Sequence, residues 1–516
     1  MNSAATLIER LAAGWTPAHS GAAMEFVRLW GERLEAVTEV KEVGADALHF
    51  VTDLSEIHLR GMDEIHCLLL GGSRDDLSKT VKGFWIKAAF PGRLIVVLAL
   101  SETAAAKAQL PMMGLDSVVL SGGEVQALLE DARPRTFFRT QLRRRLPPRS
   151  LIPYSILLSA QGGMFYGRDS ELLRLREDVD VSFAIAGPSR IGKTSLVKRH
   201  QKELARLRHP GALATFYVDC YACPNTPDGI ARTIAMEIDG SSRSARMKLD
   251  DLMNFLRFQS RVRLGRPVEL ILDEVDEVCQ SSVMRELARA ARYGFCRLIL
   301  CGRGVLLHTM LNQNSPLASR MELLRLEPLD EHAARLLLLE PLLDFGLRVE
   351  EPERLVEVVL GLTGRLPHLL QYYGRRLLEL AIQQRSETAS PRDIETLRWD
   401  FEAAQYFTSP LADLKDPWSR LVAFSILNAN GGQLTVSGVQ ELAVRAGLRD
   451  LRHVEVFQIC NDLVINNILA WEKGSFRVAN EALRYYAGQL GFLDRALEEA
   501  QREVALQEKG PGGGQP

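Results

Sequence analysis

The sequence has no long apolar segment. None of its uninterrupted apolar runs reaches the ~18 residues that a membrane-spanning helix requires. Its first residues include Glu9 and Arg10 and contain no long apolar core, so we expect no signal peptide. These absences predict a cytoplasmic protein without a membrane partner.

The sequence also lacks an excess of charge of either sign. Its formal net charge is −2, with 46% hydrophobic and 25% charged residues, which is ordinary for a soluble globular protein. No overall positive field would draw it to nucleic acid or anionic lipid, although a local basic patch could still do so. The length of 516 residues predicts about three to four domains.

Cysteine is scarce, and its pattern indicates no metal framework. Cys220 and Cys223 have the spacing of half a zinc site or of a redox pair. No second Cys/His pair at metal spacing follows them, so we favour ordinary thiols over metal or redox chemistry. We expect most of the seven cysteines to be reduced and buried in apolar segments: Cys67, Cys220, Cys223, Cys279, Cys296, Cys301 and Cys460.

What the sequence does contain is a strong phosphate-binding motif within residues 183–199. An apolar strand leads into a Gly-rich turn that opens a helix, so backbone N–H groups converge on one anion site. The glycines allow close backbone approach, Lys193 can reach the β- and γ-phosphates, and the Thr194 hydroxyl can bind Mg²⁺. The expected nucleotide-binding residues are Gly187, Pro188, Ser189, Arg190, Ile191, Gly192, Lys193, Thr194 and Ser195.

An acidic motif supplies the second half of the expected site. The apolar strand at residues 268–272 ends in Asp273 and Glu274, which in an open α/β sheet would stand at the edge where ligands bind. Asp273 would hold Mg²⁺ through its water shell, and Glu274 would orient and deprotonate the attacking water. A solvated acidic strand end is the alternative. Paired with the Lys193 loop, however, the motif completes one phosphoryl-transfer site.

These motifs resemble the STAND signal-transduction ATPases of the AAA+ superclass and the closely similar archaeal-type ATPases. The turn before the helix at residues 165–172 shares the resemblance, which implies that Gly167 and Arg168 lie on the adenine side of the nucleotide. The resemblance covers roughly residues 160–490. It implies ATP and Mg²⁺ as cofactors, and the choice of ATP over GTP rests on it.

The segment at residues 363–371 resembles the family's Gly-x-Pro helix start. The resemblance implies that Pro367 packs on the adenine, although Arg365 stands where many members have a second Gly. The segment lies within residues 330–379, whose Leu and Ala residues at helical spacing predict a small helical lid. We interpret His368 as structural rather than catalytic, since no partner for acid/base work is visible.

The resemblance also implies groups that sense the γ-phosphate. In the family, the strand matching residues 297–301 lies beside the phosphate-loop strand and ends in the sensor, here Arg303, although a surface Arg is the alternative. Arg320 could act as an arginine finger on a neighbouring subunit, a role that signal-transduction members often lack. Asp219, at the end of another apolar strand, either faces the nucleotide or caps the following turn.

The N-terminal part lies outside this resemblance. We expect helices in residues 1–45 and then an α/β layer with strands at 47–51, 65–70, 94–100 and 117–120 and helices near 75–89, after 101 and at 123–131. Its later strands weakly resemble restriction-endonuclease-like domains. The strand at 65–70 carries no carboxylate or Lys, and no Asp precedes Glu39-Val40-Lys41. We therefore expect a binding or regulatory module of unknown ligand rather than an active nuclease.

A basic segment follows at residues 133–150, with seven arginines and two prolines near its end. It could contact phosphates. We favour the alternative that it is a solvated helix face or docks on an acidic neighbouring surface.

Residues 416–490 are predicted to form a winged helix, with helices at 418–427, 435–446 and 451–467 and a hairpin at 468–478. Acids match its basic residues, which leaves little attraction to phosphate, and its third helix is largely apolar. We favour an intramolecular docking or lever role over DNA binding. The Gly/Pro-rich end, residues 507–516, is predicted to be disordered.

The predicted fold class is therefore α/β: a P-loop NTPase (AAA+-like) parallel-sheet core with a helical lid, a C-terminal winged helix and a separate N-terminal α/β domain. The predicted divisions are an N-terminal module at 1–132, a basic linker at 133–160, the ATPase core at 161–329, the lid at 330–405, the winged helix at 410–490, and a helical end with a tail at 491–516.

The predicted function is an ATP-hydrolysing signal-transduction switch whose nucleotide state controls domain arrangement or oligomerisation. Its catalytic residues would be Glu274, Lys193 and Arg303, with Mg²⁺ on Thr194 and Asp273. Partners would be ATP and ADP, and a second copy or another protein bound through the N-terminal and winged-helix domains. The alternatives are a DNA-binding ATPase of the initiator or loader type and a scaffold that binds nucleotide without turnover.

Overall fold

The structure, a computed structural model, divides into two compact units. One comprises residues 1–165, 339–349 and 374–389, and the other comprises residues 166–338, 350–373 and 390–516. The described residues are 4–16, 20–43, 47–53, 64–71, 95–101, 117–156, 159–160, 162–207, 213–241, 244–312, 314–315, 317–318, 320–397, 404, 407–408, 410–411, 414, 416–428, 434–445, 453–472, 474–489 and 492–509.

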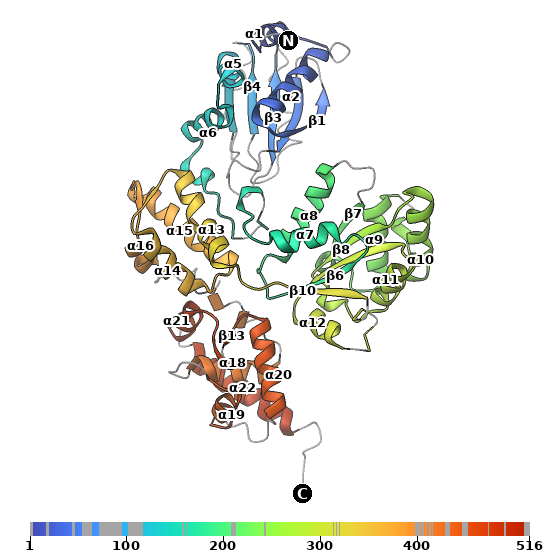
Figure 1. The fold of residues 1–516 in the computed structure, drawn as a ribbon, viewed down its shortest axis with the longest axis vertical. Helices are drawn as coiled ribbons and strands as arrows, with labels where there is room; N and C mark the ends of the chain where they lie inside the picture. Colours follow the sequence, from blue (N-terminus) through green and yellow to red (C-terminus); the bar gives the residue numbers. More distant parts are fainter. Residues whose placement is uncertain are drawn as a thin grey trace. The chain divides into compact units, whose positions relative to one another are not determined.

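The first unit is built on a five-stranded sheet in the order β1-β2-β3-β4-β5, drawn in blue in Figure 1. The pairs β1/β2 and β2/β3 are antiparallel, and the pairs β3/β4 and β4/β5 are parallel. The strands are β1 (Val37–Val43), β2 (Ala47–Asp53), β3 (Glu64–Leu70), β4 (Ile95–Ala99) and β5 (Ser117–Ser121). The expected α/β layer is therefore present.

Two details of this sheet correct the sequence-based expectation. Strand β1 lies within the first 45 residues, which we expected to be helical; its three valines favour a strand, and it pairs along β2 with a register shift between Val40 and Glu42. Strand β3 begins at Glu64 rather than at residue 65, and Glu64 pairs in register with Asp53 at the end of β2. The helices predicted near 75–89 and after 101 lie outside the described residues.

Among the described residues, four helices share an apolar core with this sheet: α1 (Ala4–Ala12), α2 (Gly21–Leu34), α5 (Gly122–Glu130) and α6 (Pro134–Arg145). Trp30 of α2 is fully buried, stacks with Phe26, meets Phe138 edge to face, and donates its indole N–H to Thr52 Oγ1 over 3.1 Å. Because α6 contributes Phe138 and Leu142 to this core, the basic segment is an integral helix of the first unit.

Several arginines of α6 bind within the first unit, which agrees with the docking interpretation. Arg135 donates to the carbonyl oxygens of Leu34 and Glu35, at 2.8 and 3.1 Å. Arg145 pairs with Glu124, and Arg139 lies 3.5 Å from Asp344. These arginines are therefore already engaged by protein groups.

The second unit contains a five-stranded, wholly parallel sheet in the order β10-β6-β9-β8-β7. Its strands are β6 (Ser182–Ala186), β7 (Ala214–Asp219), β8 (Val268–Asp273), β9 (Cys296–Gly302) and β10 (Met321–Arg325). Strands β6, β8 and β9 are buried along their whole length, as strands covered on both faces should be. The strand ending near Arg303 lies beside the phosphate-loop strand, as the resemblance implied.

Helices flank this sheet (Figure 1). They are α7 (Asp169–Glu177), α8 (Lys193–Leu207), α9 (Pro227–Asp239), α10 (Leu249–Phe258), α11 (Ser282–Arg292) and α12 (Gly304–Leu311). Helices α9, α10, α11 and α12 contribute to one apolar core with the sheet. The protein thus has a parallel α/β core, as the fold class predicted.

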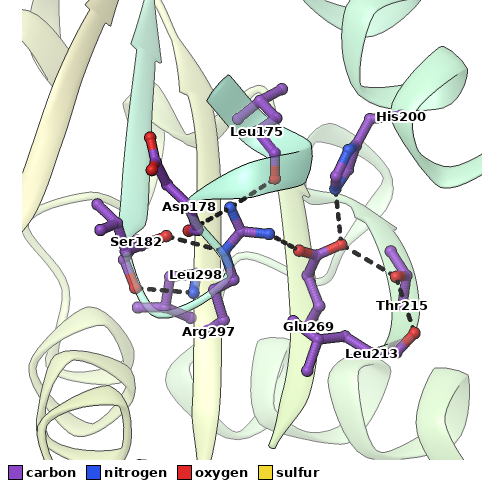
Figure 2. Close-up of polar contacts among 10 residues, drawn as sticks. Leu175, Asp178, Ser182, His200, Leu213, Thr215, Glu269, Arg297 and Leu298 are labelled. Carbon is purple, nitrogen blue, oxygen red and sulfur yellow. Dashed lines mark hydrogen bonds and ion pairs between the residues drawn. The ribbon is translucent and has the colours of Figure 1, made fainter. Parts of the chain in front are cut away.

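A buried polar network ties the amino ends of the strands together (Figure 2). Arg297 of β9 pairs with Glu269 of β8, and Glu269 also lies 3.0 Å from His200 Nε2 of α8. Arg297 further donates to the carbonyl oxygens of Leu175 and Asp178 at the end of α7, at 2.7 and 3.1 Å. The network therefore joins α7, α8, β8 and β9 at the sheet edge opposite the phosphate loop.

The predicted lid is helical. It comprises α13 (Glu331–Phe345), α14 (Pro352–Thr363), α15 (Pro367–Gln384) and α16 (Pro391–Leu397), with short strands β11 (Arg348–Val349) and β12 (Thr388–Ala389). The division between the two units falls within α13 and α15.

The C-terminal part has three helices followed by a two-stranded antiparallel hairpin, the order expected of a winged helix. The elements are α18 (Pro417–Asn428), α19 (Val436–Arg445), α20 (His453–Ile465), β13 (Leu469–Glu472), β14 (Ser475–Val478), α21 (Glu481–Gln489) and α22 (Phe492–Lys509). The expectation of disorder from residue 507 is wrong at its start, because α22 continues through residue 509. Among the described residues, no helix is long and apolar enough to cross a membrane.

Candidate functional site

The phosphate loop joins β6 to α8 and keeps the geometry that its glycines predict. Gly192 has φ +106°, a conformation that side-chain-bearing residues rarely adopt. A Cβ on Gly187 would lie only 3.0 Å from the carbonyl oxygen of Leu326. Both glycines are therefore required by the backbone, as the motif predicted.

Lys193 is the first residue of α8 and is almost fully buried. Its Nζ donates to the carbonyl oxygens of Gly187 and Pro188, at 3.0 and 2.9 Å. Burial lowers the pKa of Lys193, while the nearby carboxylates, Glu274 foremost, oppose the shift. The ammonium group thus lies inside the loop that the sequence assigns to phosphate.

Thr194 and Asp273 meet directly. The Thr194 hydroxyl donates to Asp273 Oδ2 over 2.6 Å, and the Tyr217 hydroxyl of β7 donates to the same oxygen over 2.9 Å. Burial, followed by the charge of Asp273, raises the pKa of Tyr217. The two expected Mg²⁺ ligands, from separate motifs, therefore stand side by side, and Tyr217 is a contact that the sequence motifs do not reveal.

Glu274 follows at the same edge of the sheet. Its backbone is left-handed, with φ +53°, and its N–H donates to Asp273 Oδ1 over 3.0 Å. Burial raises the pKa of Glu274, although Lys193 and Arg303 act in the opposite direction. Arg303 Nε lies 3.9 Å from Glu274 Oε2. The structure thus brings Lys193, Glu274 and Arg303 into one electrostatic neighbourhood.

Asp276 is a second residue that the motif search missed. Its carboxylate accepts the N–H groups of Arg303, Val305 and Leu306, at 2.6, 3.1 and 3.3 Å, and so caps the start of α12. A Cβ on Gly302 would lie 3.0 Å from the Asp276 carboxylate. The acidic loop and the helix after Arg303 are therefore joined as one piece.

The Gly167–Arg168 turn begins α7 beside the phosphate loop. Both residues have positive φ, +63° and +82°, and a Cβ on Gly167 would meet Ala333 at 2.8 Å. The Arg168 guanidinium pairs with Glu171, donates to the Glu327 carbonyl and lies 3.5 Å from the Ile191 carbonyl. Arg168 therefore fixes the turn to the loop through backbone oxygens.

The Gly-x-Pro segment also has the expected form. Arg365 adopts φ +62°, the conformation for which a Gly would be preferred, and its carbonyl accepts the Leu329 N–H over 3.1 Å. Pro367 is the first residue of α15, a position that suits proline. His368 follows it and is 7% exposed.

Other candidate residues take structural positions. Asp219 Oδ1 accepts the Tyr221 N–H over 3.0 Å, so it caps the following turn, as one of the two alternatives proposed. Arg190 and Arg320 are exposed, Ser189 is half-buried and Ser195 is buried. In the described part of the chain, no three His, Cys, Asp or Glu side chains form a group that could hold a metal ion.

The fold and this site define a P-loop NTPase with an AAA+-like parallel core. A profile of the family described as "Novel STAND NTPase 1" matches residues 150–486, about two thirds of the chain. The chain therefore belongs to the STAND NTPases. The match excludes most of the first unit.

The chain is also similar to several solved structures. A Walker-type ATPase of Pyrococcus abyssi is 18% identical, covering 62% of this chain and 95% of that one, with a TM-score of 0.48. The ORC2 protein of Aeropyrum pernix is 15% identical, covering 64% and 94%, with a TM-score of 0.47. The RuvB motor of Thermotoga maritima is also 15% identical, covering 64% and 96%, with a TM-score of 0.36. No curated protein sequence matches the chain significantly.

Proposed function

We propose that the chain is an ATP-binding and ATP-hydrolysing switch whose nucleotide state controls the arrangement of its domains or its self-association. The observation that carries this proposal is the 2.6 Å contact between Thr194 and Asp273. It joins the two halves of a phosphoryl-transfer site that are far apart in the sequence, and Glu274 and Lys193 adjoin it.

The residues of the site fit a magnesium nucleotide. Thr194 and Asp273 present oxygen atoms of the kind that Mg²⁺ prefers, and they lie at the N-terminus of α8, where backbone N–H groups favour an anion. Mg²⁺ bound there would neutralise charge on the phosphates. Lys193 would exchange its bonds to the Gly187 and Pro188 carbonyls for phosphate oxygens. The turns at Gly167–Arg168 and Pro367 would enclose the adenine.

Glu274 is the proposed general base, and Arg303 the proposed sensor. The raised pKa of Glu274 suits a group that accepts a proton from water. Arg303 lies between β9 and α12, so a contact between Arg303 and the γ-phosphate would shift the start of α12. Asp276 would couple this shift to the acidic loop, because it caps the same helix.

Helix α12 offers a route from this site to the C-terminal helices. Leu307 of α12 clusters with Ile465 of α20, and His308 Nε2 lies 2.7 Å from Asp462 Oδ1 of α20. These contacts support an intramolecular docking role for α20 rather than DNA reading. A ligand shifts such an arrangement only by its differential affinity for the two states, and contacts to the γ-phosphate would supply that difference.

Substitutions at the acidic motif test hydrolysis. Glu274→Gln should keep ATP binding and lose phosphate release by about 100-fold or more, since a positioned general base contributes on that scale. Lys193→Ala should lose ATP binding. Glu277→Gln removes an exposed carboxylate three residues further on and should leave both properties unchanged. Fluorescent-nucleotide titration and a phosphate-release assay measure the two properties separately.

Each outcome separates the proposal from its rivals. Equal phosphate release by wild type and Glu274→Gln, with intact ATP binding, would favour a scaffold without turnover. GTP bound as tightly as ATP would overturn the nucleotide choice, which rests on family resemblance. Duplex DNA affinity that falls steeply with salt would favour the initiator-type alternative.

A further inference from the structure

Cys220 and Cys223 occupy a tight turn directly after β7. The 3₁₀ turn η4 (Cys220–Ala222) is closed by a hydrogen bond from the Cys223 N–H to the Cys220 carbonyl over 3.2 Å. A turn closed in this way holds its first and fourth Cα atoms within about 7 Å. A disulfide requires Cα atoms about 4.4–6.8 Å apart, so the backbone already meets its main condition.

The two side chains are neighbours and differ in environment. The Cys220 and Cys223 thiols lie close enough for each to shift the pKa of the other, and the Cys223 thiol donates to the Asp219 carbonyl over 3.3 Å. Cys220 is buried, whereas Cys223 is partly exposed. Tyr221 between them is 85% exposed, so the turn faces solvent.

The other cysteines provide an internal contrast. The neighbouring Cys220 thiol lowers the pKa of Cys223 to about 7, and the same proximity raises the pKa of Cys220. At the remaining positions burial raises the pKa of the thiol. These are Cys67, Cys279, Cys296, Cys301 and Cys460. Cys223 is thus the one cysteine of the chain that combines exposure with a readily formed thiolate.

We propose that Cys220 and Cys223 form a reversible redox pair that is oxidised to a disulfide by hydroperoxides. The Cys223 thiolate attacks the peroxide oxygen, forming a sulfenic acid and releasing hydroxide. The Cys220 thiol then displaces water from the sulfenic acid, forming the disulfide. In sum, two thiols and one hydrogen peroxide give one disulfide and two waters. This chemistry does not depend on nucleotide hydrolysis.

The geometry separates this pair from a structural disulfide. The turn is held by backbone and carboxylate bonds, including that from the Tyr221 N–H to Asp219, so it keeps its form without a sulfur bridge. The bridge would close a loop of four residues, which stabilises the fold little, and reduction is therefore expected to be easy.

The test uses the full-length, reduced protein treated with hydrogen peroxide at pH 7. Intact mass should fall by two hydrogen atoms, peptide mapping should place the bond between Cys220 and Cys223, and dithiothreitol should reverse it. Thiol loss should be about 10-fold or more faster at Cys223 than at the five buried cysteines, because the thiolate is the reacting form.

Two variants define the roles of the cysteines. Cys220→Ser should stop at the Cys223 sulfenic acid, which dimedone traps as a stable adduct. Cys223→Ser should react no faster than the buried cysteines. Preferential oxidation of another cysteine, equal reactivity of the two variants, or failure of wild type to form the bridge would each overturn the proposal.

Discussion

At the scale of single residues, His368 is the most unusual group near the site. It is buried at the start of α15, close to Arg190 of the phosphate loop. Burial and the positive charge of Arg190 lower its pKa from 6.5 to about 3, although the Arg190 main chain opposes the shift. The sequence indicates a structural role for His368. It does not predict that His368 lies beside Arg190 of the phosphate loop.

The lowered pKa predicts a pH effect on stability. Between about pH 6.5 and 3 the unfolded chain protonates His368 while the folded chain keeps it neutral, so acid favours unfolding. Above pH 6.5 His368 does not lower the free energy of unfolding. Below pH 6.5 the free energy of unfolding falls by about 1.4 kcal/mol for each pH unit. Urea unfolding at pH 7.5 and 5.5 should show a larger loss for wild type than for His368→Phe. Parallel losses would contradict the assignment.

The sequence could locate the site residues that belong to one short motif. Lys193, Thr194 and the loop glycines follow from one short motif, and Asp273 and Glu274 from the end of one apolar strand. Tyr217 and Asp276 could not be found in this way, because their roles depend on which strand lies beside which. Tyr217 meets Asp273 only because β7 pairs with β8 in register.

At the scale of elements, the buried ion pair of Glu269 and Arg297 anchors the sheet. Burial alone would raise the pKa of Glu269, but the His200 hydrogen bond and the Arg297 charge lower it below its usual value. Because Arg297 also holds the end of α7, the pair positions the helix that begins at the Gly167–Arg168 turn. A buried ion pair stabilises the fold only while both partners are present, because either charge alone is costly to bury.

Removal of one partner should therefore be costly. Arg297→Met leaves the Glu269 carboxylate buried without its cation and should destabilise the protein by about 3–5 kcal/mol. The double variant Arg297→Met, Glu269→Met should recover part of this loss, since no unpaired charge remains. Arg289→Met is the control, because Arg289 is exposed and its partner Glu286 is partly exposed. Thermal unfolding measures all three, and additive losses in the double variant would exclude the coupling.

The elements themselves were predictable where apolar periodicity was strong. The buried strands β6, β8 and β9 match the expected segments because each contains a run of apolar residues, at 183–186, 270–272 and 298–301. Strand β1 was missed because its charged residues, such as Glu39 and Lys41, resemble a polar helix face, and only pairing with β2 reveals the strand. The end of α22 was missed because the Gly/Pro-rich composition of residues 507–516 as a whole predicted disorder, although residues 507–509 form its last turn.

At the scale of the whole molecule, the proposed switch requires that nucleotide chemistry reach distant helices. The connections are short: Asp276 caps α12, and α12 contacts α20 through Leu307 and His308. The contact between His308 and Asp462 is at the surface, so it contributes little to stability. A contact this weak could break when α12 and α20 separate. The domain bounds predicted from the sequence, and the role of the first unit, remain proposals.

Self-association is the global property that best tests the switch. Light scattering should show a larger molar mass with a non-hydrolysable ATP analogue than with ADP, because only the analogue offers a γ-phosphate to Arg303. Lys193→Ala should abolish the difference, since it removes the phosphate contact without touching the exposed surface. An unchanged mass in every state would exclude nucleotide-controlled assembly and leave a monomeric switch. In that case the same nucleotides should still alter the protection of α12 and α20 from hydrogen exchange, because their contact would be the moving joint.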